Sequence, residues 1–150
     1  MTAETAPPAE GTREARAELL ARADRTAAIE LADRCLDGVP APDVLRGPEV
    51  GMVMLTVREP VEATRFHLGE VLVTTCEVEH RGARGWVMRM GDDRHAALAA
   101  AVLDAEAVAA GPLAGEVAAL CAATADRVGR ERAREWADVR PTIVDFEEMD

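Results

Sequence analysis

The stretch VLVTTCEVEHRGARGWVMRM, residues 71–90, decides the fold of this chain. In its first half the even-numbered residues from Leu72 to Val78 share one face, whereas Glu77 and Glu79 point the other way. Residues 80–84 contain a Gly and predict a hairpin turn. The strand that follows places three large side chains on one side: Trp86, Met88 and Met90. Residues 71–80 and 84–90 therefore predict two antiparallel strands.

The segment before this hairpin predicts a further strand. Residues 50–58 are almost all apolar, with β-branched side chains and Met, which is typical of a strand covered on both faces. Residues 59–63 read as a connector. Three or four strands with short links predict an antiparallel meander.

Helical periodicity flanks the predicted sheet. Between 13 and 37, Leu19, Ala23, Ala27, Leu31 and Cys35 step by four, and Asp24 or Thr26 could divide the segment into two helices. Helices around 93–110, capped by Asp92 or Asp93, and around 115–138 are expected to cover the sheet. Residues 142–146 look extended.

We expect an α+β fold, a central antiparallel β-meander with helices packed at its N- and C-terminal ends. Residues 1–12 would be a disordered lead-in and 13–150 a single domain.

The composition excludes many kinds of chemistry. The chain has no Lys, Ser, Asn, Gln or Tyr, and all 17 basic residues are Arg. P-loop lysines, Schiff-base lysines, serine nucleophiles and catalytic tyrosines are therefore absent. A net charge of −11 argues against nucleic acid and anionic membranes as partners. The three cysteines are widely spaced, which predicts free thiols. We see no signal peptide with a basic and an apolar region and no apolar run long enough to span a membrane, so we expect a cytoplasmic location.

Several motifs could carry chemistry, and each has a simpler explanation. His67, Glu70 and His95 resemble metal ligands, but positions 67 and 70 would face opposite sides of a strand. Residues 46–51, with an Arg, a Glu and two glycines, fit an ordinary turn. Gly69, beside a strand start, fits a bulge. The Trp86, Met88 and Met90 stripe could bind a ligand but is more typical of a core. The residues alone favour a binding subunit over an enzyme.

Taken in order, these motifs resemble one family. The strings are Leu45-Arg46-x-Pro48-Glu49-x-Gly51; Phe66-x-Leu68-Gly69-Glu70-x-x-Val73-Thr74-x-Cys76; a hairpin with Gly85; a helix start at Gly91 with His95-Ala96; Asp104-Ala105; and Val144-Asp145-Phe146. In one collinear order over residues 15–149, the chain resembles PhnG, the G subunit of the bacterial carbon–phosphorus lyase system. It departs from the family pattern at His67 and Thr75 and in the loop 59–64, which has no glycine. An Arg that the family has after Gly91 is missing, and the chain ends in acidic residues. These departures indicate a divergent member.

The resemblance implies an accessory role in phosphonate catabolism. With the I, H and L subunits, G belongs to the synthase that transfers ribose 5-triphosphate from MgATP to methylphosphonate and releases adenine. The product, α-D-ribose 1-methylphosphonate 5-triphosphate, is later cleaved by the J subunit, and J and K join the core complex. The chemistry is attributed to I. We therefore expect no catalytic residue and no cofactor bound by this chain alone, MgATP being a substrate of the complex, and a homodimer stays open.

The resemblance also marks the residues expected to serve assembly. They are Arg46, Glu49, Gly51, Phe66, Gly69, Glu70, Thr74, Gly91, His95, Asp145 and Phe146. Two other hypotheses remain: an acidic interaction or scaffold module that has lost the pathway, and a small metal-dependent enzyme using His67, Glu70 and His95.

Overall fold

The computed structural model describes residues 11–59 and 61–143 and confirms an α+β fold. Its sheet has the order β1-β2-β3, and both strand pairs are antiparallel. The elements in chain order are α1 (Arg13–Arg22), α2 (Arg25–Leu36), β1 (Asp43–Arg58), β2 (Arg65–His80), β3 (Ala83–Met90), α3 (Arg94–Val108), α4 (Ala114–Val139) and the 3-10 turn η1 (Arg140–Thr142). None of the helices in these two ranges is long and apolar enough to cross a membrane.

The N-terminal helical segment divides where a capping residue predicts it. Asp24 accepts a hydrogen bond from Ala27 N at 2.9 Å and caps α2, and Thr12 caps α1 in the same way. The buried residues of these helices include Leu20 and Ala28 rather than the expected Leu19 and Ala27. Of the predicted lead-in 1–12, residues 1–10 lie outside the described ranges.

The β2–β3 hairpin is confirmed and has a two-residue turn. His80 pairs with Ala83, and the turn residues Arg81 and Gly82 have φ angles of 52° and 72°. Two positive φ angles in succession are typical of a type I′ turn, whose twist matches that of the strands. The turn therefore fixes the register of the hairpin.

β1 is longer than expected, because the predicted turn at 46–51 is an irregular part of the strand. Arg46 pairs with Glu77 and Glu49 with Thr75, so the register shifts between them. Gly47 has a φ of 73°, and a Cβ there would lie 2.5 Å from the carbonyl oxygen of Thr75. The glycine is therefore required by the close approach of β2.

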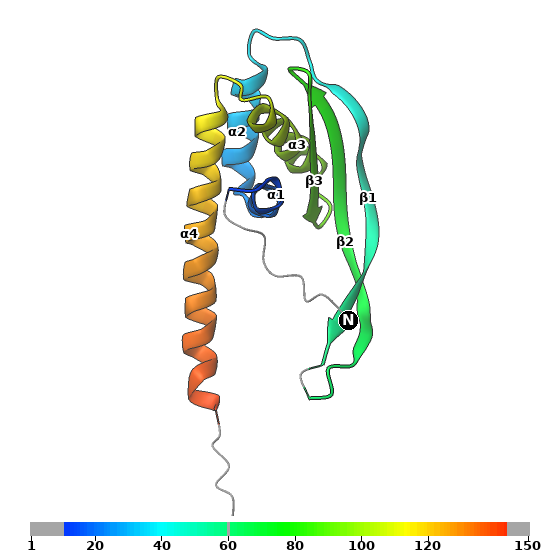
Figure 1. Ribbon diagram of the computed structural model, residues 1–150, viewed down its shortest axis with the longest axis vertical. Coiled ribbons are helices and arrows are strands. Elements are labelled where there is room, and N and C mark those ends of the chain that lie inside the picture. The colour runs from blue at the N-terminus through cyan, green and yellow to red at the C-terminus, as the bar shows by residue number, and fades with distance from the viewer. Residues whose placement is uncertain (1–10, 60, 144–150) are drawn as a thin grey trace, which may run out of the picture.

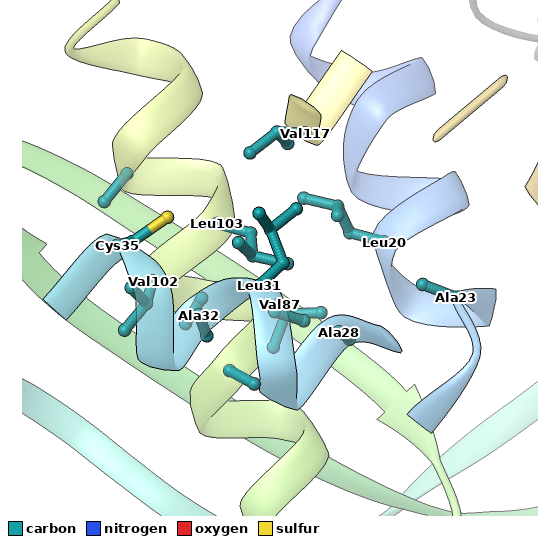
Figure 2. Packing of buried hydrophobic residues seen from close by; sticks show 14 of the residues in the cluster. Leu20, Ala23, Ala28, Leu31, Ala32, Cys35, Val87, Val102, Leu103 and Val117 are labelled. Carbon is teal, nitrogen blue, oxygen red and sulfur yellow. The ribbon is translucent and has the colours of Figure 1, made fainter. Parts of the chain in front are cut away.

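The helices form two layers on one face of the sheet (Figure 1). α3 lies against β2 and β3, where Gly85 leaves room for it: a Cβ would lie 1.9 Å from the carbonyl oxygen of Ala101. Figure 2 shows the core that α1, α2 and α3 form with β3 and the first turns of α4, including Leu20, Leu31, Val87, Leu103 and Val117. The expectation that 115–138 covers the sheet is wrong, because α4 packs on the other helices.

The expectation that residues 50–58 are covered on both faces is also wrong. Residues 51–58 of β1 and 65–72 of β2 form a two-stranded ribbon, which we call the arm, and Figure 1 shows it extending beyond α1, α2 and α3. Every described residue from 61 to 70 is exposed. At the other side of the molecule, every residue of 129–143 is exposed as well, and Thr142 lies in η1 rather than in an extended tail. The arm and the second half of α4 thus extend from the core and are not covered by the other described residues.

Candidate interaction surface

The arm carries large apolar side chains on both of its faces. Met52, Met54 and Leu68 are 59%, 54% and 61% exposed. The other exposed apolar residues of the arm are Val53, Leu55, Phe66 and Leu72. A two-stranded ribbon is at best marginally stable in water, and apolar patches of this kind mark interaction sites on proteins. The arm is therefore the strongest candidate for a functional surface in the described residues.

The base of the arm holds an exposed ion pair. Arg46 donates through Nε to Glu49 Oε1 at 2.7 Å, and the two side chains are 71% and 50% exposed. A pair in this setting contributes little to the stability of the monomer. The two residues are thus available to a partner.

Four further predicted residues lie on the arm. Phe66 pairs with Val57 and Glu70 with Met54, and both side chains are exposed. Gly69 pairs with Leu55 next to a register shift that leaves Leu68 unpaired, which confirms the expected bulge. A Cβ at Gly51 or Gly69 would lie more than 4 Å from every described residue other than its chain neighbours. Packing among the described residues therefore does not require glycine at either position.

Two predicted residues serve folding instead. Thr74 is fully buried; its hydroxyl donates to the carbonyl of Gly91 at 2.7 Å and accepts from the N–H of Asp93 at 3.2 Å. Gly91 has a φ of 89° and donates its N–H to the carbonyl of Leu72. These bonds fix the end of β3 and the start of α3. Thr74 does not reach the surface at which a partner would bind.

The residues proposed as metal ligands lie apart. His67 is on the arm, where its Nδ1 lies 3.0 Å from the Thr56 hydroxyl, whereas His95 is exposed beside Ile29 and Leu36 of α2. In residues 11–59 and 61–143 no group of three or more His, Cys, Asp or Glu side chains could hold a metal ion. Asp145 and Phe146 lie outside the described residues.

The Trp86, Met88 and Met90 stripe lines an open cavity of about 990 Å³ together with α1 and α4, so the expectation that it is core is wrong. Each of the four arginines around this cavity has a carboxylate partner, in the pairs Arg13–Asp104, Arg22–Glu18, Arg84–Glu77 and Arg127–Glu131. Charge in the lining is thus matched internally, and the cavity is not a preformed anion site.

Two buried carboxylates on α3 were not singled out as site residues. Asp104, 1% exposed, accepts from Arg16 Nε at 2.9 Å, from Arg13 at 3.0 Å and from Trp86 N at 3.1 Å. Glu106 accepts from Arg81 Nε and Leu113 N, both at 2.9 Å. In the sequence, Asp104 and Glu106 stand within a mostly apolar helical segment, and acids in such a setting indicate buried, paired carboxylates.

The three thiols are free and buried. Burial raises the pKa of Cys35 and of Cys76 to about 11, and it also raises the pKa of Cys121. Nucleophilic chemistry needs the thiolate, so these cysteines are structural.

Comparison with known proteins adds one finding. A family model described as "Phosphonate metabolism protein PhnG" matches residues 11–150, which is nearly the whole chain. A search of curated proteins finds no match.

Proposed function

This chain belongs to the PhnG family of phosphonate metabolism proteins, and from that membership we propose that it is an accessory subunit of α-D-ribose 1-methylphosphonate 5-triphosphate synthase. In the reaction, an oxygen of methylphosphonate forms a bond to C1′ of MgATP, and the bond from C1′ to adenine breaks. The ribose 5-triphosphate is thereby transferred, and adenine leaves with a proton. Because MgATP is the substrate, we place the complex in the cytoplasm.

In this proposal the chain contributes surface rather than reacting groups. The observation that carries the assembly role is the arm, on which seven large apolar side chains are 41–61% exposed although they belong to strands in the middle of the sequence. A partner that covered them would remove this surface from water, at about 25 cal/mol per Å² of apolar area. The proposed partners are the I, H and L subunits, with J and K joining the core complex.

Reconstitution tests the proposal. Purified chain is combined with I, H and L, and adenine release from MgATP is measured with and without methylphosphonate. We expect methylphosphonate-dependent adenine release with all four subunits and none from this chain alone. Equal rates with and without this chain, or turnover by this chain free of I, would contradict the proposal.

A matched pair of variants links the activity to the surface. Leu68→Glu places a charge on the exposed arm (61%), whereas Val139→Glu places one on an apolar residue of similar exposure (54%) at the end of α4. Loss of synthase activity in the first variant alone supports the arm as the contact. Equal activity in both variants counts against it.

A further inference from the structure

The tip of the arm, residues 56–58 and 65–67, carries two arginines that face each other across the strands. Arg58, the last residue of β1, pairs with Arg65, the first residue of β2, and both side chains are exposed. Like charges directly opposite each other in an antiparallel pair are destabilising. The pair therefore adds no stability to the arm, and an anion between the two guanidinium groups would relieve the repulsion.

The bulge on β2 brings the two arginines into register. An unbroken register would place Phe66 opposite Arg58. Because Leu68 stays unpaired, β2 is displaced by one residue, and Arg65 takes that position. Phe66 then pairs with Val57, whose side chain faces the other way. The bulge thus gathers cationic side chains on one face of the tip and apolar side chains on the other.

Two further hydrogen-bonding side chains lie beside the arginines on the same face. Thr56 and His67 form the next pair of this face, and the Thr56 hydroxyl lies 3.0 Å from His67 Nδ1. Residues two apart on a strand are about 6.8 Å apart, so the four side chains cover a strip longer than one phosphate or carboxylate group. A strip of this length suits a row of oxyanions, such as a triphosphate.

The acidic residue next to this face is engaged by its own loop. The carboxylate of Glu59 accepts the N–H of Val61 at 2.9 Å and the N–H of Glu62, and these bonds lower the pKa of Glu59. Most arginines of the chain have a carboxylate within 4.0 Å, but Arg65 has none among the described residues. Within this part of the chain, Arg65 thus keeps its donors for a ligand.

We propose that the cationic face of the arm tip binds the triphosphate of MgATP while a partner subunit holds the nucleotide. Arg58 and Arg65 donate charge-assisted hydrogen bonds to phosphoryl oxygens, and Thr56 and His67 extend the contact along the strip. Two arginines at one point form a local positive site although the chain as a whole carries a charge of −11. The inference rests on the proposed function, which makes MgATP a substrate of the complex, and it adds residues that bind the substrate without making or breaking its bonds.

Steady-state kinetics of the reconstituted synthase test the contact. Full-length Arg58→Ala and Arg65→Ala, each combined with I, H and L, should raise the KM for MgATP about tenfold, as loss of a hydrogen bond between charged groups does, and leave the KM for methylphosphonate unchanged. Arg65→Lys should recover part of the loss, because it keeps the charge but not the planar fork. The matched control is Arg94→Ala, an exposed arginine of α3 that pairs with Asp92 at 3.8 Å, and it should behave as the parent.

Competition identifies the part of the nucleotide that the tip contacts. The inhibition constant of inorganic triphosphate should be about tenfold higher for Arg65→Ala synthase than for the parent, whereas adenosine, which has no phosphate, should inhibit both equally. An unchanged KM for MgATP in both alanine variants, or equal inhibition by triphosphate, would overturn the proposal. So would loss of the complex on co-purification with I, because the arginines would then contact acidic groups of a partner instead of the nucleotide.

A binding experiment on the full chain alone separates this inference from the proposed function. Two arginine contacts without the partner predict a Kd of about millimolar for inorganic triphosphate. On titration, the side-chain Nε–H NMR signals of Arg58 and Arg65 should shift, and that of Arg94 should not. The alanine variants should keep the melting temperature of the parent, since they remove a pair of like charges.

The outcomes of this titration are independent of synthase activity. No shift at either arginine would overturn the proposal, whatever the activity of the complex. Shifts at both arginines, together with a complex that shows no methylphosphonate-dependent release of adenine, would support the phosphate contact and contradict the proposed function alone.

Discussion

The carboxylate of Asp104 on α3 accepts the backbone N–H of Trp86 on β3 at 3.1 Å. Trp86 belongs to the set of β3 residues whose backbone groups point away from β2, so this bond closes part of one sheet edge from within the chain. Arg13 covers the neighbouring group by donating to the carbonyl of Arg84 at 2.8 Å. The opposite edge of the sheet is β1, which has β2 as its neighbour in the sheet order. Folding of this chain thus closes part of the β3 edge.

Replacement of Asp104 by Ala should be strongly destabilising. The change leaves Arg13 and Arg16 without their buried partner and Trp86 without an acceptor. Because both arginines are partly exposed, we expect a loss at the lower end of the range for broken buried pairs, about 3 kcal/mol in the free energy of unfolding. Urea denaturation measures it. Glu131→Gln, in an exposed pair with Arg127, is the control and should change stability by about 0.5 kcal/mol or less.

Gly85→Ala and Gly129→Ala should have opposite signs. A Cβ at Gly85 would collide with the backbone of α3 at Ala101 and Ala105, so the helix must move away from the sheet. We expect a loss of about 3 kcal/mol, at the upper end for overpacking. Gly129 lies in α4, and no described residue outside its own stretch of helix comes within 4 Å of its Cβ position, so Ala there should stabilise by about 0.5–1 kcal/mol. Thermal melts of the two variants compare them, and destabilisation by both would contradict the packing argument.

The cap of α3 should give stability that depends on pH. Asp93 accepts from the N–H of Ala96, and this bond, together with Arg25, holds the pKa of its carboxyl below the ordinary 3.8. A lowered folded-state pKa stabilises the protein above the ordinary value, and this stabilisation is lost as the pH falls through the folded pKa. Asp93→Ala should therefore cost about 1 kcal/mol at neutral pH.

The difference between Asp93→Ala and the parent should narrow as the pH falls below 3.8, as measured by urea denaturation over a pH series. Asp92→Ala is the control, because Asp92 is 61% exposed and its carboxylate only approaches Arg94 at 3.8 Å. A gap for Asp93→Ala that stays constant with pH would contradict the ionic part of the cap.

The thiols should be unreactive in the native state. With a pKa of about 11 for Cys35 and Cys76, roughly one thiol in a thousand is ionised at pH 8, and burial hinders reagents further. Alkylation by iodoacetamide, followed by mass spectrometry, should be slow in buffer and should reach all three cysteines quickly in urea. Rapid modification of one thiol in the folded protein would show that its site opens.

Arg46→Ala and Phe146→Ala should weaken assembly while sparing the monomer. Arg46 makes only an exposed pair with Glu49, so its loss should change the free energy of unfolding by about 0.5 kcal/mol or less. If Phe146 anchors a partner, its truncation should cost the complex about 2 kcal/mol or more. Co-purification with the I subunit and thermal melts of each variant measure the two effects. Intact complexes would exclude the assembly role, and a collapsed melt would mark Phe146 as core.

Much of the local structure could be predicted from the residues. Asp24 divides the first helices because its side chain replaces a missing backbone partner. Arg81 and Gly82 form the hairpin turn between alternating strands, and Gly69 marks the bulge on β2. Each of these signals acts over a few residues, where the chain itself supplies both partners of the interaction.

Which surfaces are covered was decided only by the tertiary structure. Residues 50–58 are as apolar as a strand covered on both faces, yet in the structure all of them except Val50 and Val57 are exposed. Leu72, which the alternation places on one face with Cys76 and Val78, is exposed, whereas Val73 is buried. An apolar side chain signals that something must cover it, but not whether the cover comes from its own chain or another. That depends on segments far apart in sequence meeting in space, as α3 meets Gly85 and Asp104 meets Trp86.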